Sequence, residues 1–116
     1  MVSNILIKLA IPASLLGFRY LRSAIIMIIK DLKLSDNFSN KIYPQIANLF
    51  DITPSRIECA MRHAIEVSWT RCPKNVLDVY FKGIIKKSTI RKFILSIVNR
   101  VVLTSKKIIK MGVAYE

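Results

Sequence analysis

Apolar and polar residues separate onto two sides of a helix between residues 53 and 71. At about 100° per residue, the apolar side collects Ile57, Ala60, Met61, Ala64 and Val67, with Ile65 at its edge. The opposite side is polar and holds Ser55, Glu58, Cys59, Arg62, His63 and Glu66. The pattern therefore predicts an amphipathic helix over about residues 54–70, with one buried side and one exposed side.

Two sequence signals could start this helix. Thr53 can cap it, with Pro54 at the first helical position, or Ser55 and Glu58 can form an S-x-x-E capping box. Just upstream, residues 42–51 predict a shorter helix with the apolar positions Ile42, Ile46, Leu49 and Phe50. Two short helices joined by a tight turn, the second amphipathic and carrying arginine, are typical of a helix-turn-helix, which places a recognition helix in the DNA major groove.

The remaining segments also favour helices. We expect a short first helix that ends before Pro12, a central core helix that follows Gly17 and runs to about Leu32, one or two apolar turns over residues 76–83, and a final helix from Ser88 towards Lys110. Residues 32–41 are polar and rich in turn formers, so a loop is expected there. The predicted fold is all-α, a compact bundle of about five or six helices that contains the helix-turn-helix, and we expect residues 1–116 to form a single domain.

The charge balance is strongly basic. Nineteen Lys and Arg residues against seven Asp and Glu give a net charge of +12. Such a field attracts polyanions, although a lysine-rich surface can also serve only solubility. The most apolar run, residues 24–29, is far shorter than the roughly 20 residues that cross a bilayer, so no membrane partner is expected. Cys59 and Cys72 lie too far apart on one helix to bridge, which suits a reduced, cytoplasmic setting.

Three stretches carry a family resemblance: PASLLGFRYLRSAI (residues 12–25), YPQIANLFDITPSRIECAMRHAIEVSWTR (residues 43–71) and FIL (residues 93–95). They resemble the C-terminal effector domain of the stage 0 sporulation protein A family, the response regulators of sporulation. The resemblance implies an all-helical, sequence-specific DNA-binding domain that activates or represses promoters. Family members carry a phosphorylatable receiver domain as well, and nothing in these 116 residues corresponds to it.

The candidate DNA-reading residues lie on the polar side of the predicted recognition helix. Arginine reads guanine bidentately and glutamate can accept from cytosine, so Arg62 is the best base reader and Glu58 a possible second. The alternative for both is a surface ion pair at i, i+4. The resemblance adds Ser55 and Arg56, from the SR motif, and His63, from RHAIE, as DNA contacts. Lys41, just before the first helix of the pair, is a candidate phosphate contact or a solvated lysine.

Cys59 departs from the family pattern, which has a base-reading arginine at this position. A thiol cannot make the two-pronged contact to guanine, and losing one good bidentate pair costs about 1–3 kcal/mol of discrimination between bases. We therefore expect Cys59 to alter or weaken sequence preference while still occupying a base-contact position.

Catalytic and metal chemistry are not expected. Cys59, His63 and Glu66 share a helix side, but structural zinc needs four ligands and no second Cys or His pair is present. No third group orients a Cys59–His63 dyad, and three glycines cannot build a phosphate loop. We expect no enzyme activity, no cofactor and no metal.

Protein partners remain open alternatives. In the resembling family, the segment after the recognition helix meets the RNA polymerase sigma subunit, and residues 82–87 form a shorter, more basic version of it here. The distal final helix is a candidate surface for a homodimer on DNA. The chain could instead be a degenerate paralogue, a protein-interaction module that dimerises with a full-length regulator or contacts RNA polymerase while its DNA specificity is weak or altered.

Overall fold

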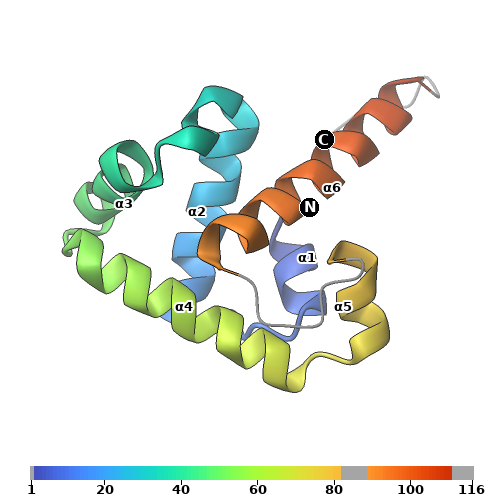
Figure 1. Cartoon of the computed structure of the whole chain (residues 1–116), viewed down its shortest axis with the longest axis horizontal. Coiled ribbons are helices and arrows are strands. Elements are labelled where there is room, and N and C mark those ends of the chain that lie inside the picture. Colours follow the sequence, from blue (N-terminus) through green and yellow to red (C-terminus); the bar gives the residue numbers. More distant parts are fainter. Residues whose placement is uncertain (1, 82–88, 111–116) are drawn as a thin grey trace.

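The computed structural model describes residues 2–81 and 89–110, the last six of these by their backbone alone. Regular structure in these ranges is helical throughout (Figure 1). The α-helices are α1 (Val2–Lys8), α2 (Leu16–Lys30), α3 (Tyr43–Phe50), α4 (Pro54–Arg71), α5 (Lys74–Tyr80) and α6 (Ile90–Lys110). The predicted all-α bundle of five or six helices with a helix-turn-helix is confirmed.

Helix α2 forms the centre of the bundle. Leu21, Ala24, Ile25 and Ile28 are completely buried along it, and α1, α3, α4 and α6 all contact it. The helix is covered on more than one side, since Ile26 and Met27 are also partly buried. No described helix is both long and apolar enough to cross a bilayer.

Gly17 lies inside α2, where it permits a close crossing with α4. A Cβ atom built at Gly17 would lie 2.7 Å from the Ala64 Cβ and closer still to the Ala60 carbonyl oxygen. Only a residue without a side chain fits there, because real carbon atoms do not approach so closely. The sequence suggested that Gly17 precedes α2; its role is instead to bring α2 against α4.

The connection between α2 and α3 consists of short helical turns rather than an extended loop. Residues expected to form a loop make a 3₁₀ segment, η1 (Leu32–Asp36), and a π-helical segment, η2 (Phe38–Ile42). The polar residues satisfy the backbone locally, since the Asp31 carboxylate accepts from the Lys33 N–H at 3.1 Å and the Ser35 hydroxyl donates to the Leu32 carbonyl at 2.8 Å. Turn formers here produce tight helical turns because Leu34 and Phe38 pack against the core.

The C-terminal elements close the core through aromatic rings. The Trp69 ring of α4 lies 5.1 Å from that of Phe81, which stacks on Phe93 of α6 at 5.0 Å between centroids. The segment after α4 therefore docks on the core through Trp69 and Phe81. One apolar stripe of α6 is buried against the core: Ile90, Phe93, Ile94, Ile97, Val98 and Val101. The expected end of the α5 segment at Gly83 lies outside the described residues.

Candidate nucleic-acid interface

Helices α3 and α4 form the predicted pair, and a three-residue turn joins them. Asp51 ends α3 in the left-handed conformation, with φ 56° and ψ 47°, and the Ile52 N–H bonds back to the Ala47 carbonyl at 2.9 Å. Thr53 then caps α4, because its hydroxyl accepts from the Arg56 N–H at 3.3 Å. The helix begins at Pro54, so the first of the two start signals is used rather than the Ser55–Glu58 box.

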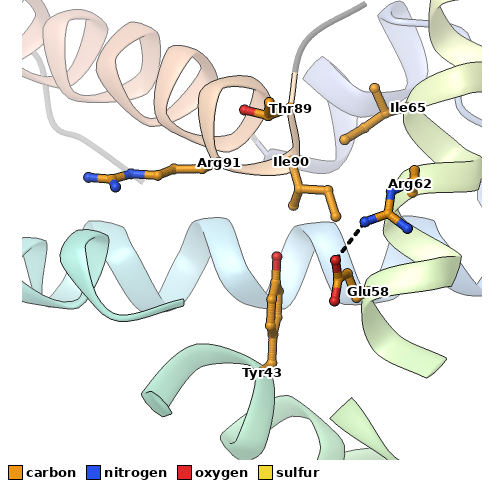
Figure 2. Close-up of a pocket in the computed structure, with 7 residues that line it drawn as sticks. All are labelled: Tyr43, Glu58, Arg62, Ile65, Thr89, Ile90 and Arg91. Carbon is orange, nitrogen blue, oxygen red and sulfur yellow. Dashed lines mark hydrogen bonds and ion pairs between the residues drawn. The ribbon is translucent and has the colours of Figure 1, made fainter. Parts of the chain in front are cut away.

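The inner side of α4 is buried in the core. Ile57, Met61 and Ala64 have no exposed surface, and Ile65 is 1% exposed. Ile65 was expected at the edge of the stripe, whereas Ala60 and Val67, expected within it, are only partly buried. The buried stripe is therefore rotated towards Ile65, whose side faces Ile90 at the start of α6 across a shared cavity (Figure 2).

The outer side of α4 presents the residues that the sequence selected. Ser55, Arg56, Cys59, Arg62 and His63 are all exposed, and Glu58 is partly exposed. Arg62 donates from Nη2 to Glu58 Oε1 at 2.6 Å, with the two side chains 53% and 44% exposed. An exposed i, i+4 pair of this kind is worth only about 0.3–0.5 kcal/mol, so a stronger acceptor can draw Arg62 away at little cost.

A cavity of about 440 Å³ lies beside this ion pair, between α3, α4 and the start of α6. Figure 2 shows the Tyr43 ring of α3 directed into it next to Glu58. Burial raises the pKa of the Tyr43 phenol, the Glu58 carboxylate raises it further, and the Arg62 guanidinium acts in the opposite direction. The candidate residues Glu58 and Arg62 thus border a hollow to which three helices contribute charged, hydroxyl and apolar groups.

A comparison with known protein families places the chain. Residues 2–101 match the family described as "Sporulation initiation factor Spo0A C terminal". The chain belongs to this family. The match runs from α1 into α6 and includes α3, the turn and α4 completely, so the resemblance drawn from the sequence is confirmed. Family membership makes the chain a DNA-binding effector domain of a sporulation regulator.

The remaining candidate residue sits apart from the α4 group. Lys41 is exposed near the end of η2, directly before α3, and so precedes the helix pair as expected. Of the α4 candidates, Glu58 and Arg62 line the cavity, while Ser55, Arg56, Cys59 and His63 occupy the rest of the exposed side. The structure thus places six candidates on one helix and the seventh on the segment that leads into its partner.

Three polar residues of the cavity lining were not selected from the sequence as functional: Tyr43, Thr89 and Arg91. Tyr43 and Arg91 are 48 positions apart, and only the packing of α6 across α4 brings them to one hollow. Thr89 caps α6, since its hydroxyl accepts from the Lys92 N–H at 3.3 Å. The only sequence signal was local, the Thr at a helix start, and it gave no indication of a shared site.

The two cysteines have opposite environments. Cys59 is free and exposed on α4, at the position where the family pattern has arginine. Cys72 is free and buried, its Sγ lies 3.6 Å from the Lys8 carbonyl oxygen, and burial raises the pKa of its thiol. They do not bridge, as the sequence predicted. Among the described residues, no three His, Cys, Asp or Glu side chains gather where they could hold a metal ion.

Proposed function

We propose that the protein is a sequence-specific transcription regulator that inserts α4 into the major groove of double-stranded DNA. One observation carries this proposal: α4 is fixed by a fully buried inner side and a three-residue turn, while its outer side exposes Arg, Ser, Cys and His side chains. A helix held this way can enter a groove without rearranging the core. The net charge of +12 supplies the long-range attraction to the phosphates.

Arg62 is the principal base reader in this proposal. Its Nη2 contacts Glu58, which leaves the Nη1 group and one N–H of Nη2 for a guanine edge. Glu58 then either orients Arg62 or accepts from a cytosine amino group. Ser55, Arg56 and His63 contact the flanking bases or phosphates, and Lys41 contacts a phosphate outside the groove.

Cys59 lies between these residues and limits what they can read. The thiol is exposed, but it offers no fork of donors to guanine. We therefore expect a DNA preference that is weaker than, or different from, that of family members with arginine at this position.

Selection of bound sequences from a random DNA pool tests the proposal. A defined consensus is expected, and Arg62→Ala should relax the preference at one base position by about 1–3 kcal/mol. Arg100→Ala is the matched control, because it also removes one arginine but from α6 rather than from α4. The guanidinium carbon of Arg100 lies 5.9 Å from the centre of the Tyr80 ring of α5. Recovery of unselected sequence by the wild-type chain would contradict sequence-specific reading.

Alkylation gives a second test with an internal reference. The exposed Cys59 thiol should react with a maleimide, while the buried Cys72 thiol should not. Bound DNA should slow the reaction of Cys59 by covering the outer side of α4. If saturating DNA leaves the rate at Cys59 unchanged, α4 does not enter the groove.

The alternative function is a protein-interaction module, and the Glu58–Arg62 ion pair together with Cys59 favours it. On α4, Arg62 is paired with Glu58, and Cys59 stands where the resembling family has arginine. Such a helix offers fewer free donors to base edges. Such a module would dimerise with a full-length regulator, with itself, or contact the RNA polymerase sigma subunit. Arg62→Ala separates the two functions, because the interaction module keeps its partner binding when this side chain is removed.

A further inference from the structure

We propose that Arg91, at the start of α6, binds a backbone phosphate of the DNA strand that borders the groove occupied by α4, and that Asp36 holds Arg91 in the free protein. This inference rests on the proposed DNA-binding function and adds a site on a different element. Arg91 lines the same cavity as the reading residue Arg62. Figure 2 shows its side chain directed away from Arg62, along the outside of the cavity.

The position of Arg91 beside α4 is the first support. With α4 in a groove, elements that flank its exposed side lie against the sugar-phosphate walls. The cavity lined by Glu58 and Arg62 is also lined by Thr89, Ile90 and Arg91, at the start of α6. The start of α6 therefore stands where one wall of the groove would pass, and it carries Arg91, which besides Arg62 is the other cation of the described cavity lining.

A second cavity extends this path. It measures about 360 Å³ and is lined by Arg91 together with residues 36–40 of the connection. Lys41, a candidate phosphate contact, follows directly on that segment. Arg91 thus joins two hollows, one beside the reading residues and one beside the segment that carries Lys41. A strand running from one hollow to the other would pass over its guanidinium.

The present partner of Arg91 is easily replaced. Arg91 Nη2 donates to Asp36 Oδ1 at 3.2 Å, and the side chains are 56% and 80% exposed. Exposed pairs with one contact contribute little, whereas a phosphate accepts two parallel N–H bonds from an arginine. A phosphate should therefore displace the Asp36 carboxylate, which would otherwise repel the approaching strand.

Substitutions of the two partners should act in opposite directions. Arg91→Gln should weaken binding to selected and unselected duplexes alike, roughly 3- to 10-fold, and lower the salt slope of log affinity by about one. Arg91→Lys should keep the salt slope. Asp36→Asn should raise affinity roughly 2- to 5-fold. In Arg91→Gln, the gain from Asp36→Asn should shrink, because the carboxylate no longer has a partner to release.

Matched controls remove equal charges elsewhere. Arg100→Gln deletes a cation of α6 that lies beside α5, and Asp78→Asn deletes an exposed carboxylate of α5. An unchanged affinity in Arg91→Gln, with Arg62→Ala still relaxing base preference, would overturn the Arg91 site and leave the proposed function intact. Equal effects of Arg91→Gln and Arg100→Gln would also overturn it, since both would then act only through net charge. Absence of any DNA affinity in the wild-type chain would overturn both proposals together.

Discussion

The inner and outer sides of α4 meet different physical demands. On the inner side, Ile57, Met61 and Ala64 are completely buried, and Gly17 of α2 leaves no room for a methyl group. On the outer side, Cys59 and its polar neighbours face solvent. One helix therefore separates the residues that fix the fold from those available to DNA. Inner substitutions should change the free energy of unfolding, and outer substitutions should change base preference.

The largest effect is expected at the crossing of α2 and α4. Gly17→Ala places a methyl group against the Ala64 Cβ at 2.7 Å and against the Ala60 backbone, which cannot move aside like a flexible side chain. We expect a loss of about 3 kcal/mol in the free energy of unfolding, measured by urea denaturation. Arg19→Ala, an exposed change on the same helix, should stay within about 0.5 kcal/mol. A Gly17→Ala variant as stable as wild type would mean that the helices do not cross closely.

Cys59→Arg tests the outer side of α4. Arginine restores a fork of donors at the centre of the exposed side, so discrimination at one base position should increase by about 1–3 kcal/mol. The free energy of unfolding should stay within about 0.5 kcal/mol, because Cys59 is exposed. Competitive binding of single-base variants measures the first quantity, and Cys59→Ala controls for loss of the thiol. Increased affinity without any change in preference would indicate that position 59 faces phosphate rather than bases.

Much of the division of α4 into a buried and an exposed side could be predicted from the sequence. Helical periodicity distinguishes two sides of a helix without reference to any neighbour, so Ile57, Met61 and Ala64 could be assigned inward and Cys59 and Arg62 outward. Thr53 and Pro54 marked the helix start through local chemistry. The family motif then supplied what the exposed residues do.

Tertiary packing accounts for what the sequence did not give. Gly17 looked like a helix start, because nothing local indicates which helix approaches a glycine. Ile65 is buried more deeply than Val67, although the periodicity within α4 alone placed Val67 in the stripe and Ile65 at its edge. Arg91 was visible only as a polar residue opposite the α6 stripe, and its neighbours Tyr43 and Asp36 come from distant segments. Contacts between residues of different helices leave no periodic pattern in the sequence.

Ser68 offers a smaller test of the inner side. It is completely buried on α4, and its hydroxyl has no hydrogen-bond partner among the described residues. An unsatisfied buried polar group costs about 1–3 kcal/mol, so Ser68→Ala should stabilise the protein by about 1 kcal/mol. Thr70→Ala, exposed on the same helix, should change stability by less than about 0.5 kcal/mol. If Ser68→Ala destabilises the fold, the hydroxyl makes a bond that this packing requires. Base preference should be the same in both variants.

The smallest expected effect lies at the edge of the outer side of α4, where Tyr43 lies beside the Glu58–Arg62 pair. Burial and the Glu58 carboxylate raise the pKa of the Tyr43 phenol above 10.0, and Arg62 opposes them. Glu58→Gln should lower this pKa towards its ordinary value without reaching it, because the burial remains, and Arg62→Ala should raise it further.

Titration of the Tyr43 ring resonances by NMR distinguishes the two directions, and Tyr43→Phe assigns the signal. Because the folded pKa lies above the unfolded value, the contribution of Tyr43 to stability is present below about pH 10 and is lost as the pH rises through the folded pKa. Glu58→Gln should therefore shift this loss to lower pH. Shifts in the same direction for both variants would show that the pair acts on Tyr43 by covering its ring rather than by charge.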